Sequence, residues 1–270
     1  RRVREPGPKA PPRPAPCLAP LLLLVFLRLA CHGYSQYCSA AVWWRDACAH
    51  AVAGFPMITH VIRASALAGC DAIIPVIAPD MEDVRESVAP HEPAFQTEQK
   101  GTGHAALCAK EALSGHSGPV LILTGDAPLI APDTLSALID AAGRTGLAVM
   151  GFDANNPSGY GRLITNDEHV TAIVEDRDCT DDQREITLCN SGAFCVDGAR
   201  LFDWLCQIGS DNAQGEIYLT DIVAIAAKDG VSCALVMGDA EEAYGINTRA
   251  QLAMVEGILQ NRLRARVMDE

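Results

Sequence analysis

The sequence has no Cys-x-x-Cys pair and no group of cysteines and histidines with the spacing of a zinc site, although it contains 11 cysteines and 7 histidines. Neither a zinc ribbon nor a thioredoxin-like redox motif is therefore predicted. Five cysteines stand in apolar segments, where we expect small buried thiols in a reducing compartment. They are Cys70, Cys108, Cys189, Cys195 and Cys233. No Ser-His-Asp or Cys-His constellation is recognisable, so no covalent nucleophile is predicted.

Aromatic and basic residues are both scarce. Aromatics make up 5% of the chain against 49% for all hydrophobic residues. This balance favours a parallel sheet covered by helices over an aromatic-rich β-sandwich. Residues 51–270 hold 14 Lys or Arg against 32 Asp or Glu. So acidic a region is a poor candidate for binding nucleic acid. If it binds phosphates, a cation must supply part of the positive charge.

Residues 1–50 differ in composition from the rest, with seven of the 16 prolines and two of the three tryptophans. The apolar run Leu21–Leu27 is followed by Arg28 and is too short for a comfortable transmembrane helix. Behind a basic start it is similar to a secretory or lipoprotein signal that ends at Cys31. An export signal and a disordered natural extension are the alternatives. We predict instead a segment that is not native to the domain, such as a misread or out-of-frame start.

From residue 51 onward, segments with the pattern of strands alternate with segments with the pattern of helices. We expect helices at Met57–Leu67, Met81–Val88, Gly103–Leu113 and Pro132–Ala142, and strands at Asp71–Ala78, Pro119–Leu123 and Gly146–Phe152. This alternation predicts right-handed crossovers and a mostly parallel sheet, which is an α/β fold.

After residue 152 the pattern changes. Arg162–Thr165 and Val170–Glu175 flank a polar turn and are expected to form a hairpin, which we predict to be a lid or subdomain over the carboxyl edge of the sheet. The remaining elements return to the alternating pattern. They are strands at Asn190–Val196 and Val231–Gly238, and helices at Gly198–Ile208, Leu219–Asp229 and Thr248–Val267.

A glycine turn that opens a helix is predicted at Gly101-Thr102-Gly103, shortly after Gln96. Free backbone N–H groups and the positive end of a helix dipole favour an anion at such a turn, and glycines allow close backbone approach. The amide of Gln96 can pair with both a donor and an acceptor on the edge of a nucleobase. An ordinary glycine-rich helix start would give the same pattern.

Asp126 follows the apolar strand that ends at Leu123, after Thr124 and Gly125. Open α/β sheets bind ligands at the carboxyl ends of their strands. Mg²⁺ takes few protein carboxylates and leaves its other positions to substrate phosphates. Asp126 is therefore a candidate Mg²⁺ ligand, and the alternative is a solvated aspartate that caps the following turn.

Further polar candidates lie downstream. The turn Gly159–Arg162 exposes backbone groups or simply connects a hairpin. Glu175 and Asn190 could anchor sugar hydroxyls, which would give strong discrimination, or could lie on the surface. Asn212–Asp221 is a polar turn that leads into a helix, and Asn247 could supply a second oxygen ligand to a metal.

Taken in order, these motifs resemble the pyrophosphorylase half of the bacterial bifunctional N-acetylglucosamine-1-phosphate uridyltransferase/glucosamine-1-phosphate acetyltransferase family, GlmU. The resemblance covers roughly Ala51 to Glu270. Its segments are Gln96–His104, Thr124–Ile130, Gly159–Arg162, Ile173–Glu175, Asn190–Gly192, Asn212–Asp221 and Gly245–Asn247. It implies a Rossmann-like nucleotidyltransferase fold and the Mg²⁺-dependent joining of UTP to N-acetylglucosamine 1-phosphate, giving UDP-N-acetylglucosamine and pyrophosphate. It also implies a cytoplasmic enzyme of peptidoglycan and lipopolysaccharide precursor synthesis.

The same resemblance implies which residues contact the substrates. The residues that would contact uracil and the nearby ribose are Gln96, Gly101 and Thr102, and Thr124 and Gly125 would lie beside the nucleotide. Those for the acetamido sugar are Gly161, Glu175 and Asn190, and those for Mg²⁺ are Asp126 and Asn247. The sugar-phosphate oxygen would attack the α-phosphorus of UTP in line, so catalysis would consist mostly of positioning and charge neutralisation.

One departure from the family pattern bears on activity. The family opens with an apolar strand, a glycine-rich loop of the Leu-Ala-Ala-Gly-x-Gly-Thr-Arg-Met type and a Pro-Lys pair. Here Leu21–Leu27 could imitate the strand, but no glycine-rich loop follows, and Ala47 stands where the lysine is expected. Because these groups would cradle the triphosphate, and one such donor is worth about 10²–10³ in rate, we predict little or no uridyltransferase activity from this chain.

A second departure concerns the other half of the family, a left-handed β-helix that carries acetyl transfer and forms trimers. No hexapeptide repeats are present, so acetyl transfer is not expected here, and the sequence leaves the oligomeric state open. We divide the chain into the atypical segment 1–50, a uridyltransferase domain at 51–250 that is incomplete at its N-terminus, and the start of a linker helix at 251–270. The alternatives are a nucleotidyltransferase for another base or sugar, a non-catalytic fragment that binds a UDP-sugar, and an exported protein anchored through Cys31.

Overall fold

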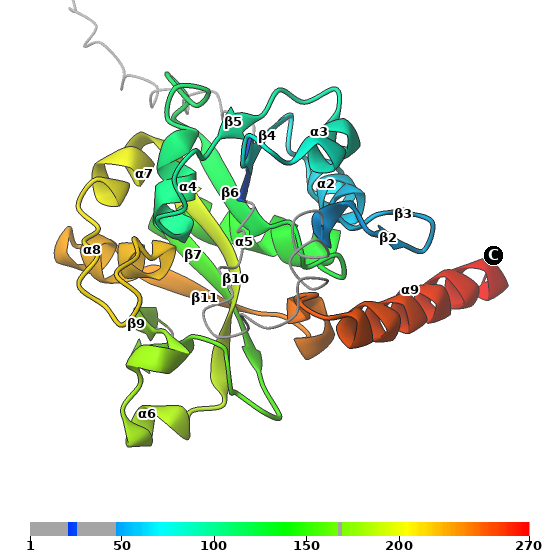
Figure 1. The fold of residues 1–270 in the computed structure, drawn as a ribbon. Coiled ribbons are helices and arrows are strands. Elements are labelled where there is room, and N and C mark those ends of the chain that lie inside the picture. Colours follow the sequence, from blue (N-terminus) through cyan, green and yellow to red (C-terminus); the bar gives the residue numbers. More distant parts are fainter. Residues whose placement is uncertain (1–20, 26–46, 167–168, 270) are drawn as a thin grey trace, which may run out of the picture.

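The computed structural model describes residues 21–25, 47–166 and 169–269. These residues form one sheet of nine strands with helices on both faces (Figure 1). The expectations for 1–20 and 26–46, including the signal ending at Cys31, and for the turn at 167–168 lie outside these ranges. The strands of the sheet are β1 (Leu21–Val25), β4 (Ala72–Ile77), β5 (Ala94–Phe95), β6 (Pro119–Thr124), β7 (Leu147–Asp153), β8 (Arg162–Asn166), β9 (His169–Val174), β10 (Leu188–Asp197) and β11 (Cys233–Met237).

The strand order is β5-β4-β1-β6-β10-β7-β11-β9-β8. Strands β5, β4, β1 and β6 are parallel to one another, and so are β7 and β11. Strand β10 lies between these two groups and is antiparallel to both β6 and β7. The α/β class and the parallel core are confirmed, whereas the strand expected at Asn190–Val196 runs against its neighbours and makes the sheet mixed.

Strand β1 lies inside the sheet. Leu21 is in register with Ala72 of β4 on one side and with Val120 of β6 on the other, so both edges of β1 are paired. The sequence predicts a domain that starts at residue 51, with Leu21–Leu27 as an imitation of an opening strand. In the structure Leu21–Val25 forms that strand, and the described part of the fold begins there.

The helices are α2 (Met57–Leu67), α3 (Glu82–Val88), α4 (Thr102–Cys108), α5 (Pro132–Thr145), α6 (Asp181–Arg184), α7 (Gly198–Leu205), α8 (Ile222–Lys228) and α9 (Arg249–Asp269). All of them except α6 and α9 pack on the two faces of the sheet, and α9 extends away from it (Figure 1). Single 3₁₀ turns are η1 (Ala47–Ala49), η2 (Asp176–Asp178), η3 (Leu219–Asp221) and η4 (Ala240–Ala243), and β2 (Ala51–Val52) pairs with β3 (Phe55–Pro56).

Three expected helices are shorter than predicted. The one expected at Leu219–Asp229 is divided into the 3₁₀ turn η3 and the helix α8. The helix expected at Gly103–Leu113 ends at Cys108, because the next N–H groups bond three residues back, as Ala109 does to Ala106 at 3.2 Å. The helix expected at Gly198–Ile208 ends at Leu205 for the same reason, since the N–H of Ile208 bonds to the carbonyl of Leu205. Tightening to i→i+3 bonds is a common way to end a helix.

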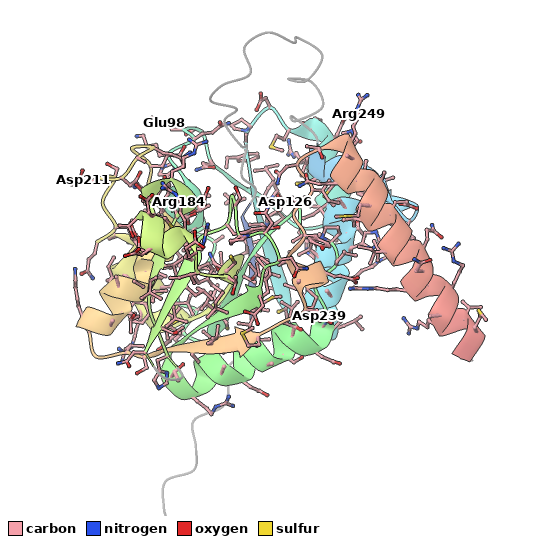
Figure 2. All side chains as sticks on the ribbon, turned by 90° about the horizontal axis from the view of Figure 1, so that it is seen from below. Glu98, Asp126, Arg184, Asp211, Asp239 and Arg249 are labelled. Atoms are coloured by element: carbon pink, nitrogen blue, oxygen red, sulfur yellow. The ribbon has the colours of Figure 1, made fainter. Side chains whose placement is uncertain are left out.

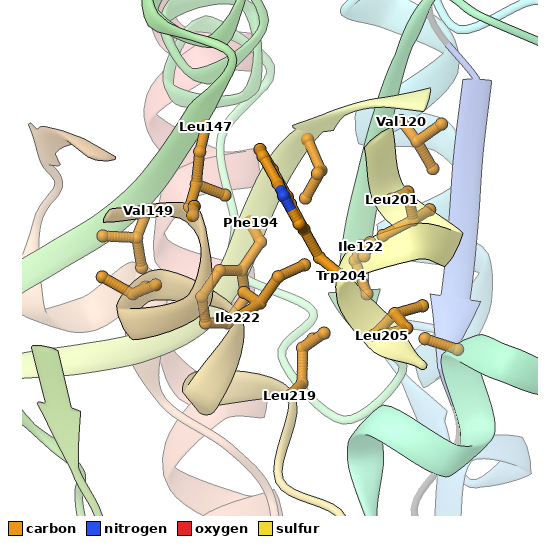
Figure 3. Packing of buried hydrophobic residues seen from close by; sticks show 14 of the residues in the cluster. Val120, Ile122, Leu147, Val149, Phe194, Leu201, Trp204, Leu205, Leu219 and Ile222 are labelled. Carbon is orange, nitrogen blue, oxygen red and sulfur yellow. The ribbon is translucent and has the colours of Figure 1, made fainter. Parts of the chain in front are cut away.

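The core forms two layers because side chains alternate between the faces of each strand. Val120 and Ile122 of β6 pack with α4, α7 and α8, whereas Leu121 and Leu123 pack with α2, α3 and α5. Both faces of the strand are thus apolar, as expected for a sheet covered on two sides. Figure 3 shows the first layer, where Trp204 of α7 lies among residues of the sheet and of the neighbouring helices.

The β8–β9 hairpin continues the sheet and does not form a separate layer over it. Strand β9 pairs with β11, and Arg162 of β8 pairs with Cys189 of β10. The lid expected from the sequence is therefore an extension of the sheet edge, at the lower end of the molecule in Figure 1.

Within the described residues, no helix has both the length and the apolar character needed to cross a membrane.

Candidate active site

Two adjoining cavities lie at the carboxyl end of β6, and Thr124, Tyr160 and Ser191 belong to the walls of both. The larger has a volume of about 400 Å³ and the smaller of about 210 Å³. Figure 2 shows Asp126, which lines the larger cavity, near the middle of the molecule in that view, whereas Glu98, Asp211 and Arg249 lie toward its rim. The cavities therefore occupy the edge of the sheet where α/β folds bind ligands.

Asp126 and Asn247 meet in the larger cavity although they are far apart in the sequence. The N–H of Ile246 donates to the carbonyl oxygen of Asp126 at 3.0 Å, which joins the two loops. Gly245 lies between the two side chains, since a Cβ there would stand 3.4 Å from Oδ2 of Asp126 and 3.6 Å from Nδ2 of Asn247. The absence of a side chain at Gly245 thus leaves room beside both polar groups.

The charge and polarity of this pair fit a divalent cation. Burial raises the pKa of Asp126, partly offset by a hydrogen bond from Thr124, and no lysine or arginine occurs among the described residues that line the larger cavity. Oδ1 of Asn247 is buried without a hydrogen-bond partner in the described part of the chain. A carboxylate without a counter-charge and an unsatisfied amide oxygen are groups that a hard cation stabilises.

The described residues hold no group of three or more His, Cys, Asp or Glu that could bind a metal. A site with only two protein oxygens suits Mg²⁺, which keeps several positions for water and phosphate oxygens. It does not suit structural zinc, which takes four protein ligands.

The smaller cavity presents a carboxylate and an amide side by side with glycine backbone. Oε1 of Glu175 accepts a hydrogen bond from Oγ1 of Thr220 at 3.0 Å. The backbone N–H of Asn190 donates to the carbonyl of Gly161 at 2.8 Å, and a Cβ on Gly161 would stand 3.5 Å from Oε2 of Glu175. Gly161, Glu175 and Asn190, predicted as one group from the sequence, therefore line one cavity.

Replacing Glu175 with glutamine is expected to stabilise the fold at about pH 8 and to have little effect at about pH 4. Burial is the main cause that raises the pKa of Glu175 above its ordinary value of 4.5, and the bond from Thr220 opposes it. In the unfolded chain the carboxyl loses its proton at the ordinary pKa, so the stability of the unsubstituted fold falls as the pH rises from there through the raised pKa. The amide of glutamine stays neutral across this pH range, so the stability of the variant does not fall in this way. Thermal unfolding midpoints across this pH range measure the effect, and a difference that does not change with pH would contradict it.

Gln96 and Gly101 do not line either cavity. Nε2 of Gln96 donates to the carbonyl of Gly101 and to Nδ1 of His104, each at 3.1 Å, so this side chain holds the loop before α4. Gly101 has φ 104° and a Cβ there would lie 2.6 Å from the carbonyl oxygen of Ile217. Thr102 lines the smaller cavity and its Oγ1 accepts from the N–H of Leu219 at 2.8 Å. The roles of Gln96 and Gly101 at a nucleobase stay predictions.

The cavity walls also include residues to which the sequence assigned no role in the site, and three of them carry polar groups of interest. Tyr160 lines both cavities, and Cys48 and Gln251 line the larger one. Burial, together with the nearby Asp126, raises the pKa of Cys48, so its thiol is held neutral. Tyr160 stands inside one of the motifs, but Cys48 and Gln251 carry only weak local signals.

Arg162 is the largest buried charged group in this region, with 1% of its surface exposed. It forms an ion pair with Asp176 at 2.9 Å and donates through Nη1 to the carbonyl of Tyr160. Because Tyr160 precedes Gly161 and Asp176 follows Glu175, this guanidinium connects the two segments that carry the walls of the smaller cavity.

The profile of the MobA-like NTP transferase domain matches residues 46–185, which is more than half of the chain. The chain belongs to this family. The bifunctional protein GlmU of Rhodospirillum rubrum is 48% identical over 223 residues, and that of Paramagnetospirillum magneticum is 44% identical over 225 residues. Each alignment covers 82% of this chain and 50% of the relative, so the chain spans about half the length of the curated relatives that it matches.

The family assignment agrees with a comparison of folds. A solved structure of UDP-glucose pyrophosphorylase with UDP-glucose superposes with a TM-score of 0.67, covering 90% of this chain and 98% of that one at 15% sequence identity. The predicted resemblance to GlmU and the predicted nucleotidyltransferase fold are thus confirmed.

Proposed function

We propose that this MobA-like domain is a nucleotidyltransferase site for UTP and N-acetylglucosamine 1-phosphate, with Mg²⁺ as the cation and the cytoplasm as its compartment. The observation that carries the proposal is the meeting of Asp126 with the unsatisfied Oδ1 of Asn247 in a cavity that adjoins Glu175 and Asn190. Similarity to two bifunctional GlmU proteins over half their length supports it.

In this proposal the protein catalyses the transfer mainly by positioning the two substrates and by neutralising the charge on their phosphates. Asp126 and Asn247 would hold Mg²⁺, which neutralises phosphate charge when bound. Glu175 and Asn190 would accept and donate hydrogen bonds to the sugar, with Thr220 fixing the carboxylate of Glu175. A bond forms between the sugar-phosphate oxygen and the α-phosphorus of UTP, the bond from that phosphorus to the β-phosphate oxygen breaks, and pyrophosphate leaves.

Two alternatives follow from the same fold. One is a nucleotidyltransferase for a different sugar, and titration with UDP-glucose and UDP-N-acetylglucosamine would distinguish it from the proposed function. A domain that binds a UDP-sugar without making it is favoured by the composition of residues 26–46, which contain one glycine and no lysine. Product binding without turnover would identify this second case.

Replacing Asp126 with asparagine is expected to weaken Mg²⁺-dependent binding of UDP-N-acetylglucosamine at least about tenfold, since a carboxylate ligand to a hard cation is lost while the shape is kept. Isothermal titration calorimetry with and without Mg²⁺ measures this. Asp203→Asn is the matched control, because Asp203 is an exposed residue of α7 and the variant has the same change in charge. Equal affinity of the Asp126 variant and the unsubstituted chain would overturn the metal site.

A further inference from the structure

Gln251 has a fixed orientation at the start of α9. Its backbone N–H donates to Oγ1 of Thr248 at 3.1 Å, and its Oε1 accepts from the N–H of Asn247 at 2.7 Å. Oγ1 of Thr248 also donates to Oε1 at 3.2 Å. This is closely related to the reciprocal pattern of a capping box, in which a Thr and a Gln three residues later satisfy backbone N–H groups at the start of a helix.

The positions of the two amide atoms of Gln251 follow from this pattern. A backbone N–H can only donate, so the atom of Gln251 that faces Asn247 must be the oxygen. The amide nitrogen, with two N–H donors, therefore points away from the N–H of Asn247. Gln251 lines the larger cavity together with Asp126 and Asn247.

The helix that carries Gln251 is anchored near the cavity. Glu256 of α9 accepts a hydrogen bond from the N–H of Ala53 at 2.5 Å, and Arg262 donates to the carbonyl of Leu129 at 3.0 Å. Leu129 belongs to the loop that follows Asp126. The helix that carries Gln251 is thus tied to the loop of Asp126, and the side chain is fixed through its Oε1 at the start of that helix, so its amide donors are preorganised.

The larger cavity has few groups that could pair with an anion. The described lining residues include no lysine or arginine. The hydroxyl of Ser191 already donates to the carbonyl of Met150 at 3.0 Å. Burial raises the pKa of Tyr160, so its hydroxyl is a neutral hydrogen-bond donor. The amide N–H groups of Gln251 are two further donors in the cavity that holds Asp126 and Asn247.

We propose that Gln251 is a phosphate-binding residue, whose Nε2 donates to phosphate oxygens carried by the cation between Asp126 and Asn247. The inference rests on the proposed function, because it requires that cation. The side chain of Gln251 would then have two roles, since its oxygen helps to cap the helix after Asn247 and its nitrogen contacts the anion. The ligand class is a pyrophosphate or a nucleoside diphosphate.

Gln251→Glu separates this role from helix capping. Glutamate keeps an acceptor for Asn247 and Thr248 and is itself favoured at this capping-box position, so the fold is expected to be retained. It removes both donors and adds a negative charge. We expect calorimetry to show Mg²⁺ binding that is unchanged or tighter, and binding of inorganic pyrophosphate with Mg²⁺ that is weaker by at least about tenfold. The control is Gln207→Glu, an exposed glutamine on the turn after α7.

Measuring pyrophosphate affinity at high ionic strength distinguishes the loss of a direct contact from long-range repulsion by the new charge. At about 1 M salt the screening length is about 3 Å, so a long-range effect of the new charge would vanish while the loss of a direct contact would persist. Pyrophosphate affinity of Gln251→Glu equal to that of the unsubstituted chain at this salt would overturn the role of Gln251 and leave the metal site standing. Failure of the unsubstituted chain to bind pyrophosphate with Mg²⁺ would overturn the proposed function and this inference together.

Discussion

The unsubstituted chain is expected to release pyrophosphate from UTP and N-acetylglucosamine 1-phosphate at least about 100-fold more slowly than the GlmU of Rhodospirillum rubrum. Residues 26–46 contain a single glycine, Gly33, and no lysine, and the resemblance to the family implies that Ala47 takes about the place of its lysine. Since most of the rate in phosphoryl-type transfer comes from positioning and charge stabilisation, missing donors to the triphosphate lower turnover directly.

Replacing residues 26–47 with the corresponding segment of that relative is expected to restore most of the difference, because strand β1 and the Asp126–Asn247 cavity are already present. The same replacement combined with Asp126→Ala is the control that shows the recovered turnover to be catalytic. Turnover of the unsubstituted chain close to that of the relative would show that residues 26–46 supply the missing contacts in another way.

Gly101→Ala is expected to destabilise the fold by about 3 kcal/mol, from backbone strain and overpacking together. With φ 104° and ψ 179°, Gly101 has a backbone conformation that only glycine adopts readily. A Cβ would also lie 2.6 Å from the carbonyl oxygen and 2.9 Å from the nitrogen of Ile217. Neither atom can move away freely, because the oxygen accepts a hydrogen bond from the N–H of Gly103 and the nitrogen donates to the carbonyl of Lys100. Urea unfolding measures the loss.

Gly143→Ala is the matched control and is expected to act in the opposite direction. Gly143 lies inside α5, is exposed, and has no heavy atom other than those of its chain neighbours and its own helix backbone within 4 Å of the place where a Cβ would stand. Alanine is favoured over glycine in a helix by about 0.5–1 kcal/mol, so this variant should be the more stable one. Equal stabilities of the two variants would contradict the account of Gly101.

Most elements are predictable from the sequence because each buried strand is apolar on both faces and each helix follows a clear turn. Helix Met57–Leu67 has the predicted bounds, and β6 extends only one residue beyond its prediction. The direction and order of the strands are not predictable in this way. Nothing in Asn190–Val196 shows that this strand lies between β6 and β7, because pairing depends on residues far away in the chain.

The members of the candidate site are predictable in groups, but their arrangement in space is not. Gly161, Glu175 and Asn190 belong together through a resemblance, whereas only the bond from Ile246 to Asp126 shows that the loops of Asp126 and Asn247 meet. Sequence reasoning missed Gln251, although Thr248 and Gln251 have the spacing of a capping box. A cap is a local signal, and only the fold shows which cavity the remaining donors reach.

The pairing of β1 also bears on how the chain is made. On the ribosome this strand is synthesised before both of its partners, and β6 follows it by enough residues that, at typical elongation rates, on the order of ten seconds pass before Val120 is available to Leu21. Strand β4 is made about halfway through that interval, so one edge of β1 can pair while the other edge still lacks its partner. The second edge of this early strand therefore stays unpaired until β6 has been made, and the centre of the sheet closes through a pairing between residues far apart in the chain, which is the slow kind of contact.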